Sequence, residues 1–319
     1  MKCKMIMTVA LALAAVQAKA DLAPTVMLRH NGASTFFKYY EVQQAVDAAV
    51  DGDTIYLTDG TYQPFNIDKR ILVRGTGSGT IIEGDCEIDI SGTAKLTMPV
   101  LDALTFNGSV IVNSGYSQFT IRQCYMTNLT FDGENHYDVK IDRCYIDNRL
   151  NLTNNVHEFN AFNSRIHTLY PHDYIGGQTT FEHCNIVSIC DTIQGGVFNS
   201  CAIGRTSKFT GAKSLINLIG CVLNSCRYFG FSESSSSLYV CGSNCTRINC
   251  GTGDSSSDSY WMDFNSTKYI SALDGTKVGA YGGQHPYSRT PELPRVTKHE
   301  LNIDAATKTM KVKLTVSKP

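Results

Sequence analysis

The sequence is poor in charge, and neither sign dominates. Charged residues make up 18% of the 319 residues, and the formal net charge is −1. Soluble domains usually carry about 25% charged residues. Without a basic field, nucleic acid is not an expected partner. The turns must therefore be built mainly from Asn, Ser, Thr and Gly. Uncharged residues of this kind suit turns that stack directly on one another.

Long hydrophobic runs are missing beyond the N-terminus, so we expect no membrane span. Residues 1–20 themselves are predicted to be a secretory signal peptide. Lys2 and Lys4 form its basic region, Met5–Val16 its apolar stretch, and Ala18-Lys19-Ala20 its cleavage site. The mature protein is therefore predicted to be exported, to the periplasm, the cell surface or the medium.

The sequence also lacks a Cys-x-x-Cys pair, although it has twelve cysteines. Six of these cysteines and one serine recur at spacings of 20, 20, 20, 17, 20 and 20 residues. Several share a frame of one apolar residue, two polar residues, Cys, any residue and one apolar residue. Blocks this short cannot each enclose a core, so they must stack on one another. The repeated positions are Cys124, Cys144, Ser164, Cys184, Cys201, Cys221 and Cys241.

Apolar residues alternate with polar ones within each block, as they do in strands. The pattern predicts an all-β fold: a single-stranded parallel β-helix, a solenoid of about 20-residue coils. We expect residues 21–53 to form an N-terminal cap with a helix over 37–50. Residues 54–285 should form the coils. Residues 286–319 should form a linker and a C-terminal strand pair that covers the other end.

Two states of the cysteines are compatible with export. Stacked coils lie about 4.8 Å apart, whereas disulfides prefer Cβ atoms about 3.8 Å apart. We therefore expect the repeated cysteines to form a reduced ladder that faces the core. Cys226, Cys245 and Cys250 lie off this column, and a bridge among them is open; zinc is less favoured because no His is near.

Several segments resemble a known superfamily. Val42–Tyr62, followed by Ile71–Gly75 and Ile81–Gly84, looks like the opening of pectin-lyase-like right-handed β-helix proteins, among them pectinesterases and chondroitinase-type lyases. Val278–Pro294 resembles the close of exported Bacteroidetes β-helix proteins. The resemblance implies a right-handed coil, in agreement with the general preference for right-handed crossovers. It does not imply one function, because such folds serve many.

The catalytic motifs of the superfamily do not carry over to this sequence. Asn-Thr-Asp, Asp-Asp and Gly-His-Gly, which polygalacturonases carry, are absent. Trp261-Met-Asp-Phe264 lacks the glycines that frame the pectinesterase aspartate. No acidic column suggests the calcium site of pectate lyases, so we expect no cofactor, with calcium required only if the protein is a lyase.

The repeat itself predicts a candidate surface. Tyr125, Tyr145 and Arg165 follow the ladder position by one residue, and Asp147 and His167 follow it by three. Both columns should face solvent, with Asp147 and His167 about 5 Å apart on adjacent coils. A lyase needs a cation for the uronate and a base such as His or Tyr. The catalytic candidates are therefore Arg165, His167 and Asp147, and the ligand-binding candidates are Tyr125, Tyr145, Arg165 and Arg149.

These columns are also compatible with a purely structural role. The charged residues would then form a solvated surface patch, and the tyrosines would form an aromatic ladder that stabilises adjacent coils. Asp142, Arg143, Glu182 and His183 precede the ladder at a turn, where we expect them to be solvated. Our leading hypothesis is a monomeric, exported, non-catalytic protein that binds a polysaccharide or a cell-surface glycan, or that serves at the cell surface. The alternatives are a polysaccharide lyase or glycoside hydrolase that acts on an acidic polysaccharide, and an adhesin or structural surface protein.

Overall fold

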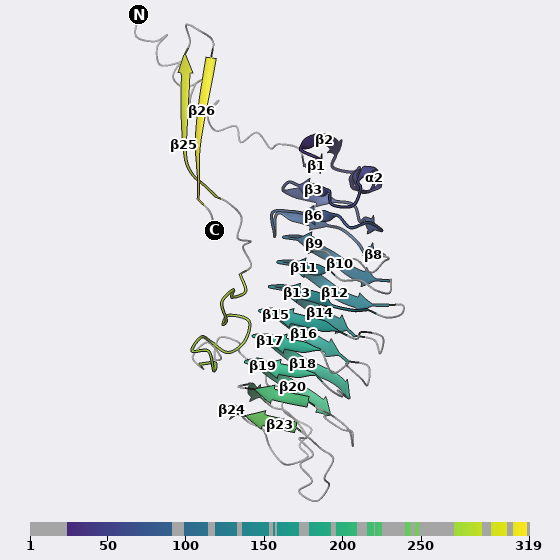
Figure 1. Ribbon diagram of the computed structural model, residues 1–319, viewed down its shortest axis with the longest axis vertical. Coiled ribbons are helices and arrows are strands. Elements are labelled where there is room, and N and C mark those ends of the chain that lie inside the picture. The colour runs from purple at the N-terminus through teal and green to yellow at the C-terminus, as the bar shows by residue number, and fades with distance from the viewer. Residues whose placement is uncertain are drawn as a thin grey trace, which may run out of the picture.

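A computed structural model shows the fold. It describes residues 24–90, 99–113, 119–132, 136–152, 156, 158–171, 179–192, 196–208, 216–219, 221–224, 240–243, 246–248, 271–288, 295–304 and 309–317. The described chain forms a β-solenoid of two parallel sheets, whose strands stack coil upon coil from the N-terminal end (Figure 1). The predicted parallel β-helix is confirmed.

The first sheet, here called sheet A, has twelve strands. Its spatial order is β2 (Ala33–Lys38), β1 (Thr25–His30), β3 (Thr54–Leu57), β6 (Leu72–Arg74), β9 (Pro99–Asp102), β11 (Thr120–Arg122), β13 (Val139–Asp142), β15 (Phe159–Phe162), β17 (Thr180–Glu182), β19 (Val197–Asn199), β21 (Ile216–Ile219) and β23 (Val240–Ser243). From β3 onward the pairing is parallel.

The second sheet, sheet B, runs beside it. Its order is β24 (Thr246–Ile248), β22 (Val222–Asn224), β20 (Ala202–Lys208), β18 (Asn185–Thr192), β16 (Arg165–Tyr170), β14 (Tyr145–Asn151), β12 (Tyr125–Phe131), β10 (Thr105–Val112), β7 (Thr80–Ile82) and β4 (Gly60–Tyr62), with β8 (Cys86–Ile88) and β5 (Asn66–Ile67) beside this path. Separately, β25 (Arg295–Asp304) and β26 (Thr309–Ser317) pair with each other as an antiparallel hairpin.

The N-terminal end differs in detail from the expectation. The helix α2 covers only Val42–Ala48, because residues 33–38 form strand β2. Strand β1 pairs antiparallel with β3 on one side and with β2 on the other. The antiparallel hairpin therefore covers the edge of the first parallel strand of sheet A, and α2 contributes Val42, Ala45 and Val46 to the core.

Like residues stack in columns inside the coil. The strands of sheet B place Met126, Ile146 and Ile166 in register, each at most 1% exposed. Burial of one such aliphatic side chain contributes about 1.5–3 kcal/mol. The alternation that predicted strands is therefore the alternation of core and surface in a half-buried sheet.

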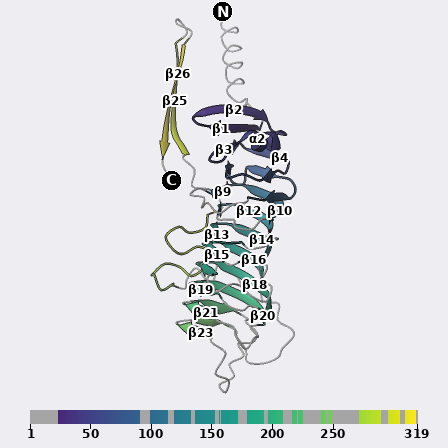
Figure 2. The ribbon, with the colours of Figure 1, turned by 45° about the vertical axis from the view of Figure 1, so that its right-hand side comes forward.

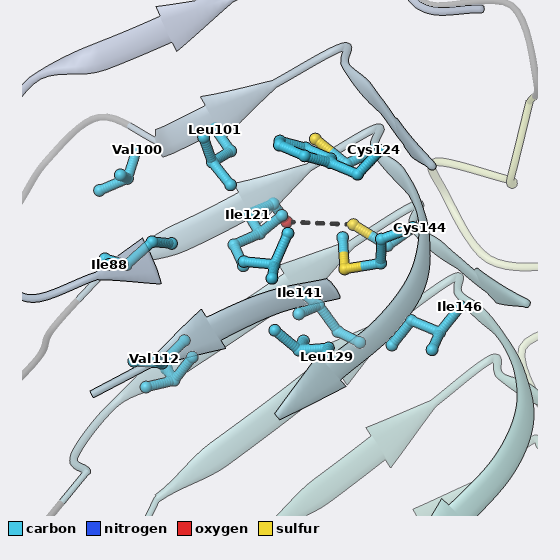
Figure 3. Packing of buried hydrophobic residues seen from close by; sticks show 14 of the residues in the cluster. Ile88, Val100, Leu101, Val112, Ile121, Cys124, Leu129, Ile141, Cys144 and Ile146 are labelled. Atoms are coloured by element: carbon cyan, nitrogen blue, oxygen red, sulfur yellow. Dashed lines mark hydrogen bonds between the residues drawn. The ribbon is translucent and has the colours of Figure 1, made fainter. Parts of the chain in front are cut away.

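The described cysteines of the repeat are free and buried, which confirms the reduced ladder. Four of these thiols, those of Cys144, Cys184, Cys201 and Cys221, donate a hydrogen bond to a carbonyl of the preceding coil. Cys144 Sγ lies 3.4 Å from the Ile121 oxygen (Figure 3). The same contact measures 3.3 Å from Cys184 to Ala161 and 3.2 Å from Cys221 to Phe198.

Burial also makes these thiols unreactive. It raises the pKa of Cys144 to about 12, so the thiolate that attacks disulfides is scarce at neutral pH. Ser164 replaces a cysteine by donating to the Phe162 carbonyl at 2.7 Å. Cys226, Cys245 and Cys250 lie outside the described residues, so a bridge among them stays a prediction.

One residue before the ladder, the chain turns from sheet A to sheet B through a single left-handed residue. Its φ angles lie between 46° and 56°, although none of these residues is glycine. Each N–H in the column donates to a carbonyl of the following coil; Arg143 donates to Phe162 at 3.0 Å. Such bonds offset the cost of the left-handed backbone. This turn column consists of Ala103, Gln123, Arg143, Asn163, His183 and Ser200.

Residues 271–288, here called the strap, run beside the turn column (Figures 1 and 2). Asn163 Nδ2 donates to the Gly282 carbonyl at 2.6 Å, and the Gly279 N–H donates to the Ser200 carbonyl at 2.8 Å. His183 lies between the Lys277 carbonyl, 3.1 Å from Nδ1, and the Asp274 carboxylate, 3.1 Å from Nε2.

The expectation that the turn residues are solvated is wrong for Arg143 and His183, whereas Asp142 and Glu182 are partly exposed. Arg143 is 8% exposed and His183 is 4% exposed. Contacts this close depend on glycine. A Cβ on Gly282 would stand 1.6 Å from the Lys277 oxygen and 2.7 Å from His183 Nδ1. The glycines of Val278–Gly283 thus allow the strap backbone to lie directly on the coils.

A charge column lies beside the turn on sheet A. The register aligns Arg74, Asp102, Arg122 and Asp142 on successive strands. The side chain of Asp102 is fully buried. Its carboxylate accepts two hydrogen bonds from Arg122, at 2.7 and 3.0 Å, and forms an ion pair with Arg74 at 2.9 Å. These hydrogen bonds are the main cause of the raised pKa of Arg122. The charges of this column therefore serve the fold.

Candidate functional site

The outward side of sheet B carries the residues that the repeat singled out. Tyr125, Tyr145, Arg165 and Asn185 stand in register on successive strands, as the spacing predicted. The rings of Tyr125 and Tyr145 meet edge to face with centroids 5.1 Å apart. The Arg165 guanidinium lies over the Tyr145 ring, 4.6 Å from its centroid. The first column is thus both an interlocking ladder and a partly exposed surface.

Strand β14 contains a bulge beside this column. Ile146 pairs with Ile166 and Arg149 with Thr168, so two residues of β14, Asp147 and Asn148, stand where β16 has His167 alone. Bulges of this kind re-aim side chains and are frequent beside functional sites. The predicted one-to-one stacking of Asp147 on His167 is therefore replaced by a two-to-one arrangement. Asp147, Asn148 and Arg149 are all exposed.

The bulge directs Arg149 toward the neighbouring coil. Its guanidinium lies over the ring of Tyr170, 5.1 Å from the centroid. The two arginine contacts therefore cross: Arg165 of β16 covers a tyrosine of β14, and Arg149 of β14 covers a tyrosine of β16. Between them, His167 Nδ1 lies 3.0 Å from Thr168 Oγ1. Contacts of this type orient a guanidinium while leaving its charge in place.

Amide and hydroxyl groups extend the same surface toward β10. Asn148 Nδ2 donates to Asn128 Oδ1 at 3.0 Å, and Asn128 Nδ2 donates to Ser109 Oγ at 3.1 Å. A parallel pair joins Asn151 Nδ2 to Thr130 Oγ1 at 3.1 Å. These groups are the donors and acceptors that sugar hydroxyls pair with.

We call the resulting surface the open face. It comprises the outward residues of β12, β14 and β16, namely Tyr125, Thr127, Asn128, Thr130, Tyr145, Asp147, Asn148, Arg149, Asn151, Arg165, His167 and Tyr170. All of them are partly or fully exposed, and they come from three consecutive coils.

Acidic residues bound the open face on its N-terminal side. Glu83, Asp85 and Glu87 are exposed at alternate positions of one coil. Groups from β10 and the residue after it bind them: Asn107 Nδ2 lies 2.8 Å from Glu83, the Ser109 N–H 2.6 Å from Asp85, and Asn113 Nδ2 3.0 Å from Glu87. The sign of the surface charge thus changes along the solenoid axis.

Six of the twelve residues of the open face were not among the predicted site residues: Thr127, Asn128, Thr130, Asn148, Asn151 and Tyr170. Tyr170 was not recognised because it belongs to another outward column than Arg165, and its partner Arg149 reaches it diagonally across the bulge. Asn128 was not a candidate because it follows the ladder position by four residues, outside the two columns that were considered. A search for outward residues in every coil, rather than in the two columns nearest the cysteine, would have found both.

The described part of the chain contains neither a metal-binding cluster nor a membrane-spanning helix. No three His, Cys, Asp or Glu side chains gather there in a way that could hold a metal ion. No helix among those residues is long and apolar enough to cross a membrane.

Comparison with known proteins adds no relative to this picture. No protein-family model matches the chain, and no curated protein or solved structure matches it significantly. Any function must therefore be argued from the open face itself.

Proposed function

We propose that this protein is exported and binds an acidic polysaccharide on its open face without cleaving it. The predicted signal peptide supports export, and the opening and closing segments support kinship with pectin-lyase-like solenoids. Within such a fold, a flat face built from repeated coils suits an extended polymer, because like groups recur about every 4.8 Å.

The crossed pair of arginine–tyrosine contacts carries the proposal. Arg165 lies 4.6 Å from the centroid of Tyr145, and Arg149 lies 5.1 Å from that of Tyr170. A ring contact uses the face of the guanidinium, whereas carboxylates and sulfates are bound at its rim, in the plane of the N–H donors. Two oriented cations on adjacent coils therefore favour a polymer with regularly spaced anionic groups.

The surroundings add selectivity to this cation pair. Tyr125 and the amide groups of Asn128 and Asn151 offer an apolar edge and hydrogen-bonding groups, the combination that sugar rings require. The exposed carboxylates of Glu83, Asp85 and Glu87 would repel an anionic chain that slides toward β10. The polymer is therefore expected to cross β12–β16.

Gel retardation in polysaccharide-loaded native gels tests the proposal. Uronate-containing polymers should retard the protein, neutral polymers should not, and added salt should weaken the effect by screening. Arg149→Gln and Arg165→Gln should each lower affinity about tenfold, the effect of about 1.4 kcal/mol. The single variants Arg29→Gln and Lys277→Gln each remove the same one charge from exposed positions elsewhere and should bind normally.

The same incubations, with and without calcium, should be followed by ultraviolet absorbance and by assay of reducing ends. Neither signal should change. New unsaturated products would overturn the non-catalytic part of the proposal and make Arg165, His167 and Asp147 the residues to mutate. Absence of retardation by every acidic polymer would overturn the binding proposal itself.

A further inference from the structure

The N-terminal end of the solenoid presents an unusual edge strand. Strand β2 is the last strand of sheet A at this end (Figure 1). In the described part of the chain it pairs with β1 alone, over six residues with no break in register. An edge strand of this kind presents backbone N–H and C=O groups to any further strand.

Proteins usually protect such edges with proline, bulges or several charges. Strand β2, of sequence Ala-Ser-Thr-Phe-Phe-Lys, has no proline and one charged residue, Lys38, at its end. Phe36 at its centre is 67% exposed, and Tyr39 and Tyr40 just beyond it are 47% and 50% exposed. Phe37, the next residue after Phe36, packs against the core instead.

We propose that β2 pairs antiparallel with β2 of a second copy of this chain, joining two solenoids at their N-terminal ends. A strand that pairs with its own copy about a two-fold axis gives a closed dimer and leaves no edge for further growth. The inference rests on the cap alone and is independent of the polysaccharide proposal.

Charge and register favour a second copy as the occupant. An axis through Phe36 places the two Phe36 rings opposite each other, the cross-strand aromatic contact that stabilises antiparallel pairs. The same axis places each Lys38 opposite Ser34 of the other copy, so like charges do not meet. A single strand pair is a small interface, and we therefore expect a dimer that depends on concentration.

Sedimentation velocity over a concentration series tests the proposal without polysaccharide present. The unmodified protein should shift from monomer to dimer as concentration rises. Phe36→Asp and Phe36→Lys should each be monomeric, because the axis brings two like charges together. An equimolar mixture of these two variants should form a heterodimer, since aspartate then faces lysine.

Leu273→Lys is the matched control, because Leu273 is an exposed apolar residue of the strap, at 58%. It should dimerise like the unmodified protein, and circular dichroism should show all variants folded. A protein that stays monomeric at every concentration overturns the proposal. So does a dimer that survives both Phe36 changes, or a mixture that fails to associate.

Discussion

Arginines on two sides of the solenoid have different partners. In the charge column, Arg74 and Arg122 bind the buried carboxylate of Asp102, whereas on the open face Arg149 and Arg165 lie over tyrosine rings. A carboxylate cancels the charge that it orients, but a ring does not. The turn column, the charge column and the strap, together the covered side, therefore hold the fold, while the open face presents the cationic groups to which we assign the proposed polysaccharide binding.

Asp102→Ala should cause the largest loss of stability, because it removes the central carboxylate of the charge column. The change leaves two arginines beside a buried position without their shared carboxylate, so we expect a loss of about 3 kcal/mol in unfolding free energy. Urea unfolding followed by circular dichroism measures this loss. Polysaccharide retardation of the folded variant should be unchanged, and weakened retardation would contradict the division between the two sides.

Gly282→Ala should displace the strap. The new Cβ would meet the Lys277 oxygen and His183, and overpacking of this kind costs about 1–3 kcal/mol. Hydrogen exchange should quicken at the Gly279 N–H. Gly275→Ala is the control, because its Cβ meets nothing within 4 Å and adds only the cost of a left-handed backbone, about 1–2 kcal/mol. Equal exchange in both variants would argue against a tightly seated strap.

Arg122→Gln and Arg165→Gln sharpen the comparison as a matched pair. Arg122→Gln should lower stability by about 2 kcal/mol, because Asp102 loses its bidentate partner. Arg165→Gln should lower stability by at most about 1 kcal/mol, the worth of an exposed cation–π contact. Polysaccharide affinity should respond in the opposite order. Urea unfolding and gel retardation of both variants test this expectation. Equal changes in stability and in affinity for the two variants would contradict the difference between the two sides of the solenoid.

Lowering the pH should weaken the docking of the strap, and we expect this effect to be smaller than those of the substitutions above. Slight desolvation raises the pKa of Asp274, but hydrogen bonds from Thr276 and the nearby His183 outweigh it and lower the pKa. A lowered folded-state pKa stabilises the docked strap above the unfolded value, about 3.9, and this contribution disappears as pH falls through the folded value. The protection of the Gly279 N–H from exchange, relative to the intrinsic exchange rate at the same pH, should therefore fall below about pH 4, and Asp274→Asn should flatten that dependence.

The sequence predicted which residues stack in register on successive coils, but it did not predict where a bulge shifts that register. The cysteine spacing correctly aligned Tyr125, Tyr145 and Arg165, because each coil repeats the same path between the same two sheets. The bulge at Asp147 and Asn148 left no trace in the spacing, since the coil still contains 20 residues. Its extra residue in β14 is visible only in the pairing with both neighbouring strands.

Contacts distant in sequence were also beyond prediction. His183 and Asp274 are 91 residues apart, and no periodicity relates them. The same holds for Asn163 and Gly282. Near the N-terminus, Phe37 and Lys38 were predicted to begin the helix over 37–50, because the helical pattern of apolar residues starts nearby. Pairing with β1 decided the outcome, as tertiary context often does for short segments.

The direction of the thiol hydrogen bonds relates the ladder to the order in which the chain is made. Four of the ladder thiols donate to the coil before them, so Cys144 needs only residues that precede it in synthesis to find its acceptor, the Ile121 carbonyl. A growing chain can thus satisfy and bury each cysteine as soon as its own coil closes.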